Sequence, residues 1–291
     1  MKRSVTEAIR HGYELTKSNW QLLVIRVAAH LFGVVLFVGA AAAIIAPIIV
    51  SAGLGNFKID RPEDNPVEVL LQILSDHWAL LLFILVVITV LLIVVVAVHS
   101  FVQAGSADVY AADEFSADRF LRGGKRGWLQ VFWIYNLAWL VAGVVMLIPL
   151  LPIPLFLLLS HESMVMIGVS CLLIAIWTGI TIVVVLATAL WTIKAIVLAM
   201  TKNLPARDAL KAARAAIRAE PGPHLALGLL LYLIWGGVSS LIGMFSGVAS
   251  VGHVTPLAIF TAPLQLVLTF VNAIFSAVME SLFLASFMSL E

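Results

Sequence analysis

The stretch NLPARDALKAARAAIRAEPGP, residues 203–223, lies between two long apolar runs and decides how the chain is read. Its cations recur at helical spacing and form one face: Arg207, Lys211, Arg214 and Arg218. Apolar residues such as Leu210 and Ile217 lie next to that face. Pro205 suits a first helical turn, and Pro221 would stop the helix. The stretch therefore predicts a short basic amphipathic helix.

The composition is that of a polytopic membrane protein. The chain has 291 residues, of which 62% are hydrophobic and 11% charged, and its mean hydropathy is +1.10. Soluble domains have about half apolar and a quarter charged residues. The net charge of +1 gives no reason to expect a nucleic-acid partner. The single cysteine, Cys171, excludes an internal disulfide.

Six apolar stretches are long enough to cross a bilayer, which takes about 20 residues at about 1.5 Å per residue. They are Leu22–Ala46, Trp78–Phe101, Trp128–Leu150, Met164–Met200, Leu225–Ser246 and Pro263–Phe287. The fourth exceeds one perpendicular crossing, so it must tilt, bend or continue into the cytoplasm. The first is too long for the hydrophobic core of a signal peptide, so we expect it to remain as an anchor.

A pattern like that of residues 203–223 precedes two other spans. Before the first span, apolar and charged residues of SVTEAIRHGYELTKSNW separate onto two helical faces, and Ser4 and Glu7 have capping-box spacing. Before the third, SADRFLRGGKRGW is a degenerate copy. We therefore expect an all-α fold, a single transmembrane domain over residues 1–291 with three pseudo-repeats, approximately 4–115, 116–202 and 203–291. Each repeat would be an amphipathic interfacial helix followed by a transmembrane hairpin.

The basic helices are expected to lie in the headgroup plane, with their cations toward anionic lipid. The alternative is that these segments are ordinary basic loops. The candidate headgroup contacts are Arg10, Lys17, Arg122, Lys125, Arg126, Arg207, Lys211, Arg214 and Arg218.

The distribution of cations predicts the orientation. Outside the spans, only Lys58 and Arg61 lie on one side, and the other Lys and Arg lie on the opposite side. Cytoplasmic loops carry the excess of cations. We therefore expect a multi-pass protein of a bacterial inner (plasma) membrane with both termini cytoplasmic. The acidic residues between 51 and 78 are dispersed among prolines, which favours a solvated outer loop with a short helix near Val67–Leu74 over a calcium site.

Ionisable and polar side chains inside the spans need partners. The sixth span carries polar residues at steps of four, three, four and four, which forms one face: Gln265, Thr269, Asn272, Ser276 and Glu280. This stripe must point into the bundle, because lipid offers no hydrogen-bond partners. It either joins helices, with Glu280 paired to Arg26 or Lys194, or forms the wall of a proton or solute path.

The fifth span carries small residues on one face, which are Gly236, Ser240, Gly243 and Gly247. Small residues let helix backbones approach closely in lipid, so this face predicts a packing seam. The neighbour would be another span or another subunit.

No cofactor is expected. His30 and His99 raise the possibility of haem or pigment ligation, but His30 would lie about 15 Å into the first span and His99 near the cytoplasmic end of the second. The disagreement in depth argues against a bis-histidine haem, while a single pigment ligand stays open.

Enzyme motifs are missing from the sequence. It contains no GxSxG elbow, HExxH pair, Walker loop, dinucleotide fingerprint or CxxC pair. The first hypothesis is therefore a non-catalytic scaffold or accessory subunit of a membrane complex, with lipid and other membrane subunits as partners. The second is a small transporter or lipid-handling protein that uses the polar stripe around Glu280.

The segments TEAIRHGYELTKSNWQLLV (6–24) and ARDALKAARAAIRAEPGPHLALGLLLYL (206–233) resemble a group of bacterial polytopic proteins. That group includes the membrane domain attached to some glycerophosphoryl diester phosphodiesterases and its stand-alone relatives. The resemblance implies a six-span helical protein. It implies no catalytic residue, because the activity of that family resides in a separate soluble domain.

Overall fold

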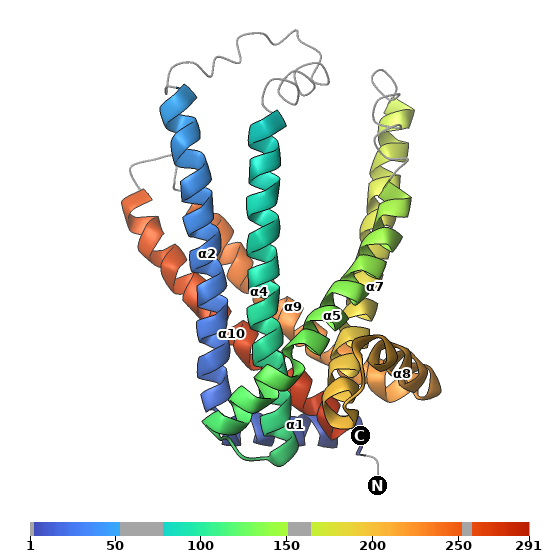
Figure 1. Cartoon of the computed structure of the whole chain (residues 1–291). Coiled ribbons are helices and arrows are strands. Elements are labelled where there is room, and N and C mark those ends of the chain that lie inside the picture. Colours follow the sequence, from blue (N-terminus) through green and yellow to red (C-terminus); the bar gives the residue numbers. More distant parts are fainter. Residues whose placement is uncertain (1–2, 53–77, 151–163, 252–257, 291) are drawn as a thin grey trace. The chain divides into compact units, whose positions relative to one another are not determined.

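The computed structural model describes residues 3–52, 78–150, 164–251 and 258–290 (Figure 1). These residues form an all-α structure, and six of its helices are long and apolar enough to cross a membrane. The prediction of a six-span helical protein is therefore confirmed. The outer loop lies outside the described residues, and so do its predicted short helix near residues 67–74 and the acidic residues considered for a calcium site.

The helices follow the order of the sequence patterns. Their bounds are α1 Val5–Ser18, α2 Gln21–Ala52, α4 Trp78–Ala112, α5 Ala117–Leu150, α7 Met164–Lys202, α8 Ala206–Ala219, α9 Pro221–Val251 and α10 Ala258–Ser289. The six long helices correspond to the six apolar runs, and α1 and α8 are the two short helices expected before the first and fifth spans.

Helix α1 begins at a capping box. The Ser4 backbone N–H donates to Glu7 Oε2 at 2.8 Å, and the Glu7 backbone N–H donates to Ser4 Oγ at 3.3 Å. The first of these bonds is the main reason why the pKa of Glu7 lies below its usual value. The buried face of α1 packs on α10, where a Cβ added to Gly12 would lie 2.7 Å from the backbone nitrogen of Ser286. Gly12 therefore permits a close approach of the two helices.

Helix α8 lies against α7. Its buried face is made of Ala209, Leu210 and Ala213, and the Trp191 indole of α7 donates to the backbone oxygen of Leu210 at 2.7 Å. The helix ends at Ala219, two residues before Pro221, as the sequence predicted.

The third basic segment differs from the other two. Residues 117–128 form the start of the continuous helix α5 and not a separate helix. The glycines in this segment lie where the end of α4 passes close: a Cβ on Gly124 would lie 2.6 Å from Cζ of Phe101, and one on Gly105 of α4 would lie 2.7 Å from the backbone oxygen of Phe120. These glycines thus allow close packing without breaking the helix.

Most of the long helices continue past the predicted end of their spans, and α4 does so by the largest number of residues. Helix α4 extends to Ala112, well beyond Phe101, and α7 has 39 residues, which is about 58 Å of helix. Asp113 and Asn203 follow them in the left-handed region, with φ of 52° and 53°. Asp and Asn tolerate this conformation, which commonly ends a helix.

The chain forms two compact units. The first comprises Met1–Val27 and Ser100–Glu291, and the second comprises Ala28–His99. Within the first unit, α5 packs on α7 and α9 packs on α10. Within the second, α2 and α4 are antiparallel, since His30 contacts His99 and Gly33 lies near Val95. The three pseudo-repeats stay a prediction.

Candidate functional site

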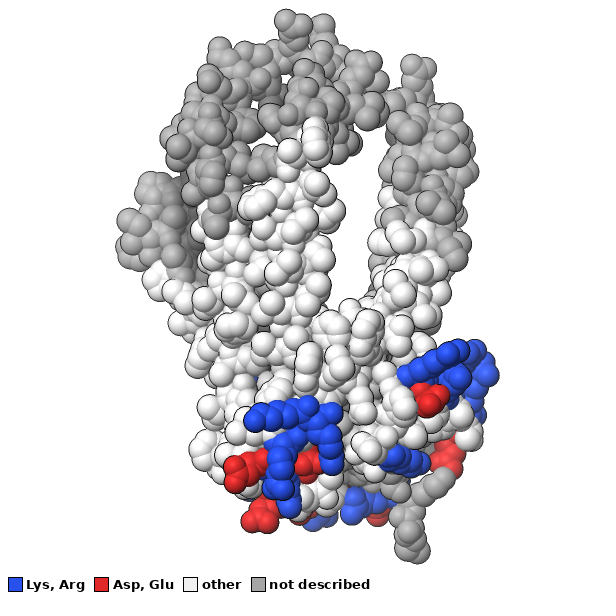
Figure 2. All heavy atoms as spheres, viewed as in Figure 1, with Lys and Arg blue, Asp and Glu red and all other residues white. Residues whose placement is uncertain are grey.

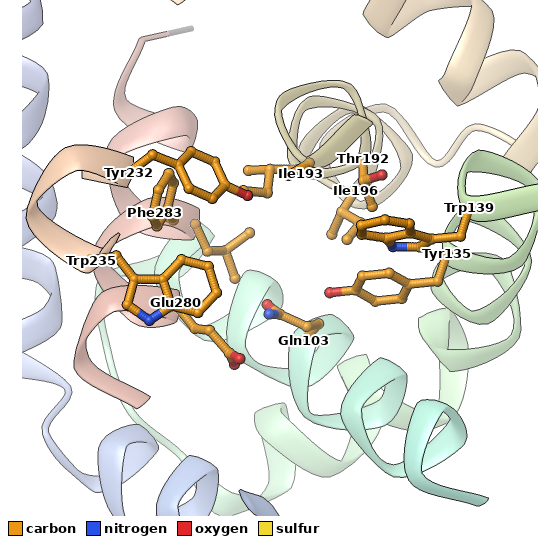
Figure 3. Close-up of a pocket in the computed structure, with 12 residues that line it drawn as sticks. Gln103, Tyr135, Trp139, Thr192, Ile193, Ile196, Tyr232, Trp235, Glu280 and Phe283 are labelled. Carbon is orange, nitrogen blue, oxygen red and sulfur yellow. The ribbon is translucent and has the colours of Figure 1, made fainter. Parts of the chain in front are cut away.

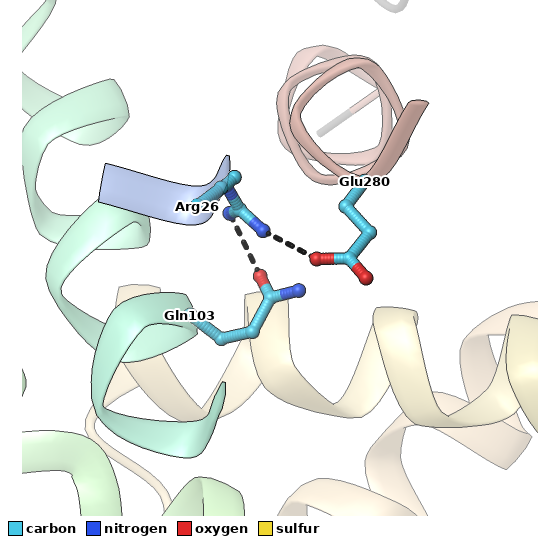
Figure 4. A network of polar contacts seen from close by, with 3 residues as sticks. All are labelled: Arg26, Gln103 and Glu280. Carbon is cyan, nitrogen blue, oxygen red and sulfur yellow. Dashed lines mark hydrogen bonds and ion pairs between the residues drawn. The ribbon is translucent and has the colours of Figure 1, made fainter. Parts of the chain in front are cut away.

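A buried arginine lies at the centre of the candidate site, which belongs entirely to the first unit (Figure 4). Arg26 of α2 exposes 1% of its side chain. Its Nη1 lies 3.1 Å from Glu280 Oε2 on α10, and its Nη2 donates to Gln103 Oε1 on α4 at 3.0 Å. One guanidinium therefore joins three helices that are far apart in sequence.

The position of Arg26 follows from the inner face of α2. Leu22, Arg26 and Ala29 are all buried and fall at helical spacing on one side of that helix. The helix begins at Gln21, two residues after Asn19, whose backbone N–H caps α1 by donating to the Leu15 oxygen. The corner between α1 and α2 thus fixes where the buried face of α2 starts.

The sequence offered two candidate partners for Glu280, and the structure places one of them beside it. Arg26 and Lys194 were both candidate partners of Glu280, and Arg26 pairs with it directly. Lys194 is also buried, with 3% exposure, on α7. The Arg26 side chain is buried inside the protein, so its stabilisation depends on the two oxygen acceptors.

A cavity of about 170 Å³ opens beside the ion pair (Figure 3). Glu280 lines this cavity and exposes 23% of its side chain, whereas Arg26 exposes 1% and does not line it. Helices α4, α5, α7, α9 and α10 all contribute to the wall. Among the described residues, Glu280 is the one charged residue that lines the cavity.

Aromatic side chains form two sides of the cavity. Tyr135 and Trp139 project from α5, and Tyr232 and Trp235 project from α9 on the opposite side (Figure 3). The Tyr135 hydroxyl points toward the amide of Gln103. The cavity therefore combines aromatic ring faces with a carboxylate and an amide.

The aromatic wall on α9 is held by rings that pack on one another. The ring centroids of Tyr232 and Phe283 lie 4.9 Å apart, and those of Trp235 and Phe283 lie 6.3 Å apart. Such tilted and edge-to-face contacts are favourable geometries for aromatic pairs. Phe283 of α10 thus fixes the orientation of both α9 rings.

The polar stripe divides between two places. Glu280 lies at the cavity, while Thr269, Asn272 and Ser276 line a groove of about 310 Å³ between α9 and α10, together with Ser239 and Gly243. The Thr269 hydroxyl donates to the backbone oxygen of Gln265 at 2.8 Å, within its own helix. The stripe therefore does not form one continuous wall of the cavity.

The predicted packing seam on α9 faces open space in the described part of the chain. A Cβ added to Gly236 or Gly243 would meet no atom within 4 Å, and Ser240 is exposed. The surroundings of Gly247 lie outside the described residues. Close packing at this face stays a prediction, and it requires a helix that lies outside the described part of the chain or belongs to another subunit.

The depth argument for the histidines was wrong. The His30 and His99 rings, both in the second unit, lie 4.9 Å apart between centroids at an interplanar angle of 64°. Helix α4 continues for 13 residues past His99, so this residue is deeper than the end of the apolar run suggests.

The candidate headgroup residues gather at one end of the first unit. Figure 2 shows the Lys and Arg side chains around the ends of the helices near α1 and α8. Two of these cations pair with carboxylates: Arg10 with Glu14 at 3.2 Å, and Arg126 with Asp108 at 2.8 Å. The remaining predicted contacts, Lys17, Arg122, Lys125, Arg207, Lys211, Arg214 and Arg218, are exposed.

Sequence reasoning missed most of the cavity. Gln103 lies beyond the predicted second span, and Tyr135 and Tyr232 were read as ordinary residues of their spans. No local pattern marks these three residues as neighbours of Glu280, because they meet only where α4, α5 and α9 surround one cavity.

Comparisons of the chain with protein-family models, curated proteins and solved structures gave no match. The resemblance to the phosphodiesterase membrane domain therefore stays a prediction from the sequence.

Proposed function

We propose that the protein is a non-catalytic, multi-pass protein of a bacterial inner membrane that binds a small organic cation in the cavity beside Glu280. This is the solute-handling hypothesis of the sequence analysis with a ligand class added. The observation that carries it is a carboxylate that lines a cavity walled by five aromatic side chains. Because Glu280 lines the cavity and Arg26 does not, a ligand would meet the carboxylate first.

The chemistry of the wall favours a cation with an apolar body. Ring faces of Trp and Tyr attract cations through their quadrupole, and ligands with quaternary ammonium groups are bound by such aromatic cages. The Glu280 oxygens and the Gln103 amide oxygen supply acceptors at the same place. A cavity of about 170 Å³ is close to one of about 150 Å³ that holds benzene, so the ligand is small.

The test compares choline with 3,3-dimethylbutanol, its uncharged carbon isostere, by calorimetry on the full chain in nanodiscs. We expect choline to bind at least tenfold more tightly, because only the cation gains from the ring faces and the carboxylate. Trp139→Leu removes one ring of the wall and should weaken choline binding about tenfold. Trp133→Leu is the matched control, since Trp133 is exposed on the same helix and does not line the cavity.

Equal binding of the two compounds, or no binding of choline, would refute the cation proposal. Equal weakening by the two tryptophan variants would show that the effect does not come from the cavity.

A second function, the scaffold or accessory subunit, is favoured by the groove between α9 and α10. Its exposed polar residues, such as Asn272, are costly toward lipid, and a helix from a partner subunit would satisfy them. Its open glycine face would let that helix approach closely. Co-purification from native membranes tests this function. Gly243→Leu should abolish the co-purification, whereas Gly143→Leu, at another glycine with open surroundings, should not.

The proposed topology places both termini and the three basic segments on the cytoplasmic side, with α1 and α8 on the inner leaflet. The support is the concentration of cations at that end of the first unit (Figure 2). Single cysteines near Lys125 and Arg214, introduced after Cys171→Ser, should react with an impermeant reagent only from the cytoplasmic side. Labelling from opposite sides would refute the repeat.

A further inference from the structure

A groove of about 430 Å³ lies between α5, α7 and α8, away from the cavity of the proposed function. One part of its lining is apolar and comes from the membrane spans, with Val141 and Val145 on α5 and Val184 and Ala187 on α7. The other part comes from α8 and carries Arg214 and Arg218. The groove therefore has an apolar track and a cationic end.

The cationic end is held in place by the packing of α8. The bond from the Trp191 indole to Leu210 fixes α8 on α7, and Trp191 itself lines the groove. Arg214 and Arg218 are one helical turn apart, so both guanidinium groups project from the same side of α8.

These two arginines are available for an anion. Both are exposed, and neither forms an ion pair with any residue in the described ranges. Helix α8 carries four cations and, of acidic residues, Asp208 alone. Guanidinium groups bind phosphate oxygens through parallel hydrogen bonds.

We propose that this groove holds one anionic phospholipid, with its phosphate on Arg214 and Arg218 and an acyl chain along the valines of α5 and α7. Charge complementarity and the apolar track support this occupant together. A free phosphate would use the arginines and leave the apolar track empty. A neutral hydrocarbon would fill the apolar track and leave the arginines without an anion. The proposal rests on the membrane position proposed for α8 but not on the cavity at Glu280.

The test uses native mass spectrometry of the full chain released from nanodiscs that contain equal amounts of phosphatidylglycerol and phosphatidylcholine. We expect one phosphatidylglycerol to be retained per chain in preference to phosphatidylcholine. The double variant Arg214→Gln/Arg218→Gln should lower this retention at least tenfold.

The matched control is Arg207→Gln/Lys211→Gln. It removes the same charge from the same helix at positions that do not line the groove, and it should retain the lipid. Equal loss in both double variants would show diffuse attraction to the headgroups and overturn the proposal. No loss in either variant would overturn it as well.

A second variant tests the apolar track without touching a charge. Ala187→Phe places a ring in the groove and should reduce lipid retention at least fivefold, and unchanged retention would overturn the acyl-chain part. Competition by glycerol phosphate as strong as that by phosphatidylglycerol would show a plain anion site and would also overturn the proposal. Failure of the labelling test near Arg214 would instead remove the membrane position of α8, so the two failures can be told apart.

Discussion

The sharpest stability prediction concerns the ion pair between Arg26 and Glu280. Glu280→Gln keeps an oxygen that can accept a hydrogen bond but leaves the guanidinium, which is 1% exposed, without a countercharge. Removing one partner of a buried ion pair costs about 3–5 kcal/mol. Because Gln103 and the new amide still accept hydrogen bonds from Arg26, we expect a loss of stability at the lower end of this range, about 3 kcal/mol. At about 1.4 kcal/mol per factor of ten, the folding equilibrium falls roughly a hundredfold.

Replacing Arg26 should destabilise the protein less than replacing Glu280. Arg26→Met leaves Glu280, which is 23% exposed toward the cavity and can be reached by water. The carboxylate then loses one hydrogen bond from a charged donor, which is worth about 1.5–3 kcal/mol. The double variant Arg26→Met/Glu280→Gln removes both charges and should lie within about 1 kcal/mol of the natural chain, since uncharged replacements of a buried pair are often neutral.

The measurement is reversible unfolding in mixed micelles with a rising fraction of dodecyl sulfate, followed by tryptophan fluorescence. Glu114→Gln, at an exposed carboxylate, is the matched control and should change stability by less than about 0.5 kcal/mol. The reasoning is wrong if Glu280→Gln costs no more than this control. It is equally wrong if the cost of the double variant is the sum of the two single costs.

Three further predictions concern the helix contacts near the basic end. Gly12→Ala should destabilise the protein by about 1–3 kcal/mol in the same unfolding assay, because the added methyl group meets the α10 backbone; Gly143→Ala, at an open position, should not. Trp191→Phe removes the indole donor to α8 and should cost about 0.5–1.5 kcal/mol, seen as faster hydrogen exchange confined to α8. The capping bond from Ser4 lowers the pKa of Glu7, so the stability that this bond adds to α1 is present above the ordinary pKa and lost as the pH falls through the lowered one. Followed by carbon-13 NMR, the Glu7 carboxyl group should titrate at lower pH than an exposed glutamate. An ordinary midpoint would contradict the cap in solution.

Local patterns predicted the helices but not all of their ends. The capping box at Ser4 and the proline after α8 are properties of a few neighbouring residues, so the sequence could reveal them. The continuity of α5 through Gly123 and Gly124 depends on where α4 passes, and no local pattern contains that information. The extension of α4 to Ala112 was missed because the prediction followed the apolar run, and this run ends before the helix does.

The candidate site was predictable only in part. A deep carboxylate requires a partner, and this physical argument led from Glu280 to Arg26. That Arg26 reaches Glu280 could not be read from the sequence, because it depends on where the start of α2 lies within the first unit. The aromatic wall could not be predicted, because Tyr135 and Tyr232 become neighbours of Glu280 only when α5 and α9 surround one cavity.

The ion pair also has a consequence for biosynthesis. Arg26 and Glu280 are 254 positions apart, so at roughly 5–20 residues per second the ribosome needs about 13–50 s to make the carboxylate after the arginine. During that interval five of the spans can already have left the translocon. The last span therefore supplies the countercharge that completes the bundle, and a nascent chain truncated before it would expose a lone cation that membrane quality control can recognise.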